Sequence, residues 1–126
     1  MTTVLDTSAI LAWLRDETGA ETVDPVLGDA TVSSVNWSEL AQKLAQHGAD
    51  ARRTCDRLRT LGVLVEPFTA DDALRAGELW PNTRSLGLSL GDRACLAVAL
   101  RLDAPVMTAD KAWRDIDVRV PIRLLR

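Results

Sequence analysis

The sequence has few of the residues that build metal knuckles, redox pairs and disulfide frameworks. It contains two cysteines, Cys55 and Cys95, one histidine, His47, and no tyrosine. The cysteine spacing fits neither a zinc knuckle nor a redox pair, so we expect two reduced thiols in a cytoplasmic protein. We expect His47 at the surface, near the end of a helix.

Long hydrophobic runs are also missing. The longest unbroken apolar run, residues 94–100, is far shorter than the roughly 18 residues that span a bilayer. No basic segment followed by an apolar stretch opens the chain, so we expect no signal peptide and no association with a membrane.

Positive charge is not in excess. The chain has 15 lysines and arginines against 18 aspartates and glutamates, which gives a formal net charge of −3. This balance argues against a protein that grips nucleic acid by its overall charge. It leaves open an enzyme that gathers carboxylates around a metal ion and keeps its arginines elsewhere.

The chain does contain a regular alternation of short apolar strands and helices. Its 126 residues, 47% of them hydrophobic, fit a single domain over residues 1–126. We expect strands at 3–5, 31–35, 63–66 and 105–108, and a last strand within 118–125. We expect helices at 9–15, 40–46, 51–61, 70–80 and 92–102, with short helices between 19 and 28 and near Trp113. This alternation predicts an α/β fold with a parallel central sheet flanked by helices on both faces.

Acidic side chains recur where the expected strands end or the expected helices begin. Asp6 follows the first strand, and Glu39 lies in the expected first turn of the helix after the second strand. Asp92 begins the most apolar helix, and Asp110 follows the fourth strand. Because the carboxyl ends of parallel strands meet at one edge of a sheet, the four carboxylates are expected to converge there.

Helix capping is the competing explanation for each of these acids taken alone. The side chains with the position or spacing of a cap are Asp6, Thr7 or Ser8 at the first helix, Asn36 with Glu39, Ser89 with Asp92, and Asp110. Four converging carboxylates, however, repel one another unless a cation neutralises them. Oxygen ligands of this kind suit Mg²⁺ or Mn²⁺, and such a site supports phosphodiester hydrolysis without a histidine or serine base.

In this order and spacing, the motifs resemble those of PIN-domain ribonucleases, most closely the toxins of VapBC-type toxin–antitoxin pairs. The residues that carry the resemblance are Leu5-Asp6-Thr7-Ser8, Glu39, Leu88-Ser89-Leu90-Gly91-Asp92-Arg93 and Thr108-Ala109-Asp110. Each motif alone is weakly specific, but their ordered combination covers essentially the whole chain. The resemblance implies a PIN-like fold, divalent-metal-dependent cleavage of RNA by a metal-activated water, a homodimer, and inhibition by a small antitoxin protein.

The resemblance also implies roles for individual side chains. The residues that match the acidic quartet are Asp6, Glu39, Asp92 and Asp110. Asp6 and Asp92 would ligate the metal directly, and the other two would act through waters. Asp115 and Asp117 lie close enough in sequence to compete with Asp110 for the fourth place.

A hydroxyl group accompanies the first acid. Ser8 matches the hydroxyl that follows it by two positions, and we interpret it as a positioning group rather than a nucleophile. Thr7 and Thr108 are weaker candidates for the same task.

Aromatic and basic side chains outside the acid set indicate where partners could bind. We expect Trp13 and Trp113 in the core or an interface, Trp37 beside the site and Trp80 at a dimer contact. The arginines on the helix over 51–61 are expected to form a solvated face or to receive an acidic segment of an antitoxin; they are Arg52, Arg53, Arg57 and Arg59. An antitoxin is also expected to lay apolar side chains into a groove near Trp13 and residues 40–44.

Two other functions compete with a ribonuclease toxin. One is a catalytically silent PIN domain that only binds RNA or a protein partner, although such a domain has no need to keep mutually repelling acids. The other is a phosphatase that forms an aspartyl-phosphate. That chemistry usually needs a second aspartate two residues after the first, where this chain has Ser8, and no lysine is placed to complete such a site.

Overall fold

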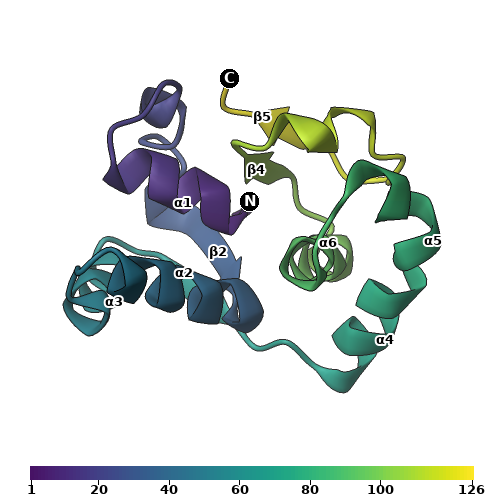
Figure 1. Ribbon diagram of the computed structural model, residues 1–126, viewed down its shortest axis with the longest axis horizontal. Helices are drawn as coiled ribbons and strands as arrows, with labels where there is room; N and C mark the ends of the chain where they lie inside the picture. The colour runs from purple at the N-terminus through teal and green to yellow at the C-terminus, as the bar shows by residue number, and fades with distance from the viewer.

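A five-stranded parallel sheet lies at the centre of the molecule. The computed structural model describes residues 1–126 (Figure 1). Its strands are β1 (Thr3–Leu5), β2 (Ala30–Ser33), β3 (Leu64–Glu66), β4 (Val106–Thr108) and β5 (Ile122–Leu124). They pair in the order β3-β2-β1-β4-β5, and every pair is parallel. The predicted α/β fold with a parallel central sheet is confirmed.

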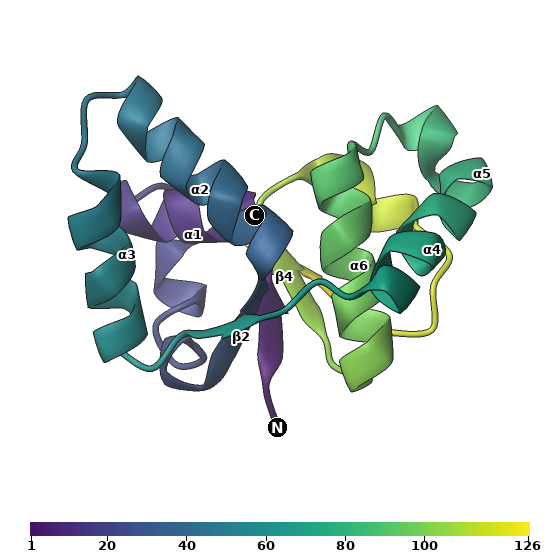
Figure 2. The same ribbon diagram turned by 90° about the horizontal axis from the view of Figure 1, so that it is seen from below.

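Helices cover both faces of this sheet. They are α1 (Thr7–Leu14), α2 (Ser34–Gln46), α3 (Ala51–Thr60), α4 (Ala70–Glu78), α5 (Trp80–Thr83) and α6 (Leu90–Leu102). Short 3₁₀ helices lie at Ala20–Thr22, Leu27–Asp29, Arg84–Leu86 and Lys111–Asp115. Figure 2 shows α1, α2 and α3 on one side of the strands and α4, α5 and α6 on the other. None of the helices has the length and apolar character needed to cross a membrane.

Two hydrophobic clusters hold the layers together, one on each face of β1. Leu5 packs into a cluster with Leu40 and Leu58, under α1, α2 and α3. Its neighbour Val4 packs into a second cluster with Leu96 and Trp113. Successive side chains of a strand point to opposite faces, so β1 is buried on both sides and anchors the sheet.

The start of α2 differs from the prediction. The helix begins at Ser34 rather than residue 40, because Ser33 caps it with a side-chain oxygen that accepts from the backbone N–H groups of Val35 (3.1 Å) and Asn36 (3.3 Å). The predicted capping box of Asn36 and Glu39 is therefore wrong, and Glu39 lies in the second turn of the helix. This shift leaves both side chains available for contacts with other elements.

The helix predicted over 70–80 ends two residues early. Thr69 and Asp72 form a capping box at the start of α4, and the helix stops at Glu78. Pro81 lies in the first turn of the next helix, α5. Proline is tolerated there because the first N–H groups of a helix have no partner within it.

Candidate active site

Asp6 lies where β1 leaves the sheet and α1 begins. It occupies the N-cap position of α1, but its side chain makes no capping hydrogen bond. Instead its Oδ2 accepts from Ser8 Oγ (2.7 Å) and Thr108 Oγ1 (2.9 Å), and the residue is 3% exposed. The capping explanation is wrong for Asp6. The carboxylate is held by hydroxyl groups from α1 and β4.

The Ser8 hydroxyl is fully engaged in this arrangement. Besides donating to Asp6, its oxygen accepts from the backbone N–H of Ala109 (2.9 Å) and lies 3.1 Å from Thr108 Oγ1. The hydroxyl thus ties α1 to the end of β4. A group with these bonds orients Asp6 and is poorly placed to act as a nucleophile.

Glu39 reaches the same region from α2. Its Oε1 accepts from Thr7 Oγ1 (2.9 Å) and from Asn36 Nδ2 (2.9 Å). The fully buried Asn36 also donates to the carbonyl of Gly91, at 3.0 Å, near the start of α6. A β-carbon at position 91 would overlap the Glu39 carboxyl group. Glycine at this position therefore leaves room for the Glu39 carboxyl group where it lies.

Asp92 caps α6 with one carboxyl oxygen and leaves the other without a hydrogen bond. Its Oδ2 accepts from the backbone N–H of Ser89 (2.9 Å), and Ser89 Oγ accepts from the N–H of Asp92 (3.2 Å). The predicted capping box is confirmed. The other carboxyl oxygen, Oδ1, makes no hydrogen bond within the protein, so it remains available as a ligand.

Asp110 lies at the edge of this arrangement. It is exposed, and its carboxylate caps the 3₁₀ helix over Lys111–Asp115 by accepting from the N–H of Ala112 (2.9 Å). Its charge is among those that raise the pKa of Asp92. Asp115 and Asp117 are both exposed. Of these three aspartates, Asp110 is the one whose charge raises the pKa of Asp92.

Burial and mutual repulsion disturb these carboxyl groups. Burial, with the charges of Asp92 and Glu39, raises the pKa of Asp6 to about 6 against the hydrogen bonds from Ser8 and Thr108. Burial, together with the charges of Glu39 and Asp110, likewise raises the pKa of Asp92. The ion pairs of the protein join Arg101 to Glu66 and Asp72, and Arg126 to Glu17. The converging acids therefore have no basic partner.

The acid cluster consists of four carboxylates, those of Asp6, Glu39, Asp92 and Asp110. Its oxygen donors fit a hydrated divalent cation. No three acidic, cysteine or histidine side chains lie close enough to enclose an ion. Mg²⁺ rarely needs such an enclosure, because it keeps several waters and is commonly held by one or two carboxylates. The Cys95 thiol lies near the acids, but burial and their charges raise its pKa well above the ordinary value, so it stays protonated.

Sequence reasoning missed two residues of the cluster. The sequence predicts Asn36 as a cap and Gly91 only as part of a motif. In the structure Asn36 donates to both Glu39 and the Gly91 carbonyl, and Gly91 leaves room for the Glu39 carboxyl group. The spacing of Asn36 and Glu39 is shared by capping boxes and by side chains on one face of a helix. The stronger cap, Ser33, was the signal that could have separated the two cases.

The predicted tryptophan and leucine positions differ in their exposure. Trp113 is fully buried in the core, as expected, and Trp80 is 49% exposed. Leu40 and Leu44 are buried in the core, so the predicted groove does not include them.

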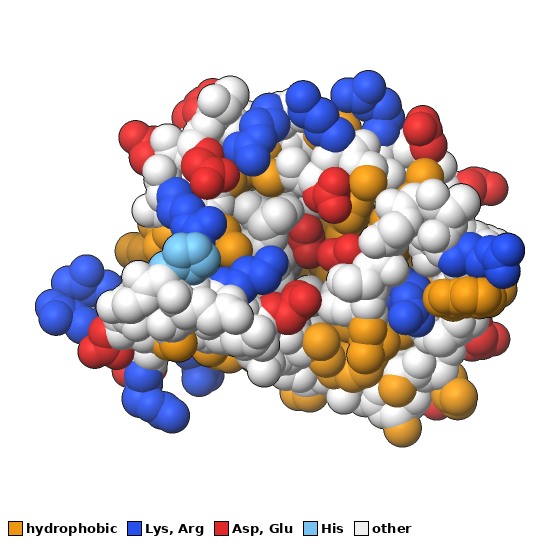
Figure 3. Space-filling model, viewed as in Figure 1, with side chains coloured by type: hydrophobic (Ala, Val, Ile, Leu, Met, Phe, Trp, Pro, Cys, Tyr) orange, Lys and Arg blue, Asp and Glu red, His pale blue; other side chains and the backbone are white.

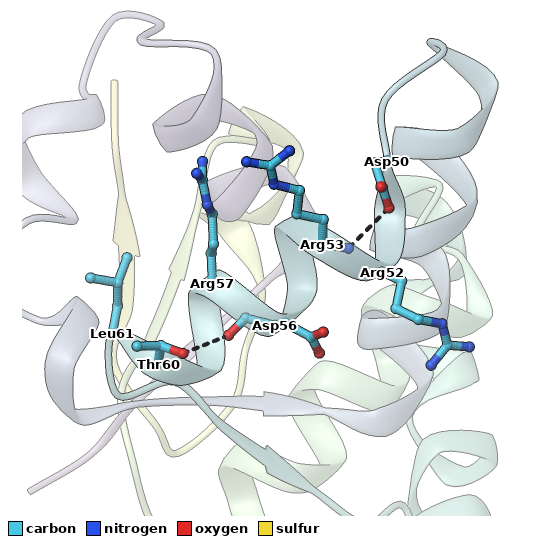
Figure 4. A pocket seen from close by; sticks show the side chains of 7 residues that line it. All are labelled: Asp50, Arg52, Arg53, Asp56, Arg57, Thr60 and Leu61. Atoms are coloured by element: carbon cyan, nitrogen blue, oxygen red, sulfur yellow. Dashed lines mark hydrogen bonds between the residues drawn. The ribbon is translucent and has the colours of Figure 1, made fainter.

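The arginines of α3 do form a solvated face, and three of them line a hollow of about 700 Å³ together with Asp50 and Asp56 (Figure 4).

Several solved structures with the same fold are toxins or toxin–antitoxin complexes. A toxin–antitoxin complex from Klebsiella pneumoniae aligns at 20% identity, covers 90% of this chain and 92% of that one, and has a TM-score of 0.73. VapBC-1 from nontypeable Haemophilus influenzae aligns at 20% identity over 99% and 98%, with a TM-score of 0.73. Mycobacterium tuberculosis VapC20, a toxin that cleaves the sarcin-ricin loop, aligns at 20% identity over 94% and 98%, with a TM-score of 0.74.

Sequence comparison gives the family. No curated protein matches the chain significantly by its sequence alone. The family model of the PIN domain, however, matches residues 3–119. That range contains every strand but the last and all four carboxylates of the cluster. The chain belongs to the PIN domain family.

Proposed function

We propose that the protein is a divalent-metal-dependent endoribonuclease and the toxin of a toxin–antitoxin pair. The observation that carries the proposal is the convergence of Asp6, Glu39 and Asp92, whose negative charges raise carboxyl pKa values and meet no basic partner. Proteins tolerate such repulsion where a cation relieves it. Family membership and the similarity to VapC20, a toxin that cleaves the sarcin-ricin loop, support the same chemistry.

Each residue of the cluster has a distinct part in this proposal. Asp6 and Asp92 would hold the ion, and Glu39 and Asp110 would orient its waters. When bound, Mg²⁺ or Mn²⁺ supplies a nucleophilic water and neutralises charge that develops on the scissile phosphate. Ser8 and Thr108 keep the Asp6 carboxylate in one orientation. Thr7 and Asn36 do the same for Glu39.

Cleavage of RNA is the direct test. Labelled total RNA is incubated with the purified chain in Mg²⁺, in EDTA, and with Asp6→Asn or Asp117→Asn. We expect discrete fragments only when Mg²⁺ and Asp6 are both present, and full activity for Asp117→Asn, which changes an exposed acid in the same way. Absence of cleavage by a folded, metal-loaded, antitoxin-free protein would favour the alternative, a silent PIN domain that only binds RNA or protein.

The proposed antitoxin contact is the surface of α3. A groove of about 380 Å³ on one side of this helix is lined by Trp13, Leu14, Leu58 and Leu61. A second groove, of about 430 Å³, is lined by Trp37, Ala41, Ala51 and Cys55. The arginine hollow of Figure 4 lies on the same helix. Apolar grooves beside exposed arginines suit an amphipathic segment that also carries acidic side chains.

The proposed homodimer uses the opposite side of the molecule. Leu74 on α4 is 69% exposed and Leu90 at the start of α6 is 60% exposed, and Trp80 lies on α5. Figure 3 shows hydrophobic side chains exposed on this side of the molecule. A second copy would cover them. Light scattering should give a dimer for the wild-type chain and a monomer for Leu74→Asp.

The two surfaces control for each other. Leu61→Asp, on the α3 face, should weaken binding of the cognate antitoxin about tenfold or more and leave the dimer intact. Leu74→Asp should have the reverse effects. Unchanged antitoxin affinity in Leu61→Asp, measured by calorimetry, would remove α3 as the contact.

A further inference from the structure

A hollow beside the acid cluster is lined by basic side chains that the proposed reaction does not use. It has a volume of about 300 Å³ and is lined by Asp110 of the cluster and by Ser8, the hydroxyl that donates to Asp6. Three bases line the rest of it together with Glu17 and two apolar residues, Leu11 and Ala109; the bases are Arg15, Lys43 and Arg126. We call these three bases and their surroundings the basic hollow.

The basic hollow is a continuation of the site along two helices. Arg15, the C-cap residue of α1, lies seven residues after Ser8, two turns farther along the same face. On α2, Glu39 and Lys43 are four residues apart, one turn along one face. Along each helix a residue of the candidate site, Ser8 or Glu39, is therefore followed by a base on the same side. Figure 3 shows acidic side chains in the middle of this face with basic ones around them.

The charges of the basic hollow are only partly neutralised. Arg126 donates to the carbonyl of Thr18 (3.0 Å) and pairs with Glu17 at 3.4 Å, which fixes its guanidinium at the rim. Arg15 and Lys43 make no ion pair. The helix dipole favours a base near the end of either helix, but it does not explain why bases from three segments meet beside the acids.

We infer that the basic hollow binds backbone phosphates of a single RNA strand next to the scissile bond. The inference rests on the proposed function, because it identifies how that substrate is held. A polyanion is repelled by the acid cluster and by the net charge of −3, so neighbouring phosphates need local positive charge. Arginine and lysine are the usual phosphate ligands, and such contacts position a strand without reading its sequence.

Salt-dependent binding distinguishes this role from a merely structural one. Each phosphate contact contributes about 0.7 to the slope of log K against log[salt] for a single strand. Fluorescence anisotropy with a labelled single-stranded RNA of random sequence supplies that slope. All variants carry Asp6→Asn, which prevents cleavage during the titration. We expect Arg15→Ala and Lys43→Ala each to lower the slope by about 0.7 and to weaken binding roughly three- to tenfold.

Matched variants complete the test. Arg123→Ala removes the same charge from an exposed position on β5 and should change neither slope nor affinity, while Lys43→Arg keeps the charge and should retain both. An unchanged slope in Arg15→Ala and Lys43→Ala would overturn the inference. If those variants instead lost affinity for a polyglutamate peptide, the hollow would serve an acidic protein segment.

Cleavage separates this inference from the proposed function. If the wild-type protein cuts RNA and Arg15→Ala and Lys43→Ala bind RNA normally, the inference about the basic hollow is wrong but the proposed nuclease activity stands. A chain that neither binds nor cuts RNA would remove both.

Discussion

The Glu39 carboxyl group lies against the Cα atom of Gly91, where a β-carbon would overlap it. The contact joins α2 to the start of α6, beside Asp92. The position of Glu39 therefore depends on the absence of a side chain at position 91, the residue before Asp92.

Gly91→Ala should displace Glu39 and damage the site. The added methyl group must push the carboxylate or separate the two helices, so we expect at least a tenfold loss of RNA cleavage and a destabilisation of roughly 1–3 kcal/mol. Gly77→Ala is the matched control, because nothing lies within 4 Å of that β-carbon on α4. It should stabilise the fold by about 0.5–1 kcal/mol. Thermal denaturation and the cleavage assay, run on both variants, check this; normal cleavage by Gly91→Ala would contradict it.

Acidity should affect the metal-free protein through Asp6. The folded state raises the pKa of this carboxyl from 3.8 to about 6, a difference worth about 3 kcal/mol. A raised pKa means that the folded state holds the proton more tightly, so the contribution of Asp6 to stability is fully present below about pH 4 and is lost as the pH rises through about 6. Denaturation in EDTA should show this decline, and Asp6→Asn should flatten it. A wild-type profile that Asp6→Asn leaves unchanged would exclude Asp6 as its source.

Bound metal should reverse that loss. At neutral pH, a ligand that binds only the folded state stabilises it by mass action. We therefore expect Mg²⁺ to raise the melting temperature of the wild-type chain and to leave that of Asp6→Asn unchanged.

Arg101 should stabilise the fold through Asp72. Asp72 is 3% exposed, and its two carboxyl oxygens accept from Arg101 Nε (3.0 Å) and Nη2 (3.1 Å). Burial raises the pKa of Asp72, but the hydrogen bonds from Arg101 and Thr69 outweigh it and lower the pKa overall. The pair's contribution is thus complete above the unfolded pKa near 4 and disappears as the pH falls through the lower folded value.

Removal of this partner is expected to be costly. Arg101→Met leaves a buried carboxylate unpaired, which should cost roughly 1–3 kcal/mol, less than for a fully buried pair because the arginine side chain is 33% exposed. Arg75→Met is the matched control. Arg75 lies beside Asp72 and Arg101 but forms no ion pair, so its loss should have little effect. Urea denaturation of both variants measures the difference; equal stabilities would show that the pair contributes nothing.

The sequence was sufficient for the parallel sheet and for the positions of Asp6 and Asp110 after its strands, because these signals are local. Val4 and Leu5 are apolar and precede a carboxylate, and the parallel sheet follows from the alternation of such strands with helices. The arrangement around Glu39 was not predictable in the same way. It depends on Ser33 beginning α2 early and on Asn36 bonding to Gly91, which is 55 residues away in the chain. The environment of Asp6 likewise depends on Thr108, from the other end of the chain.

Binding of Mn²⁺, followed by electron paramagnetic resonance, tests the central claim most directly. The account predicts that the wild-type chain binds Mn²⁺, that Asp6→Asn and Asp92→Asn each weaken binding about tenfold or more, and that Asp115→Asn does not. Absence of Mn²⁺ binding, or binding that Asp6→Asn leaves unchanged, would contradict the assignment of these carboxylates to a metal site.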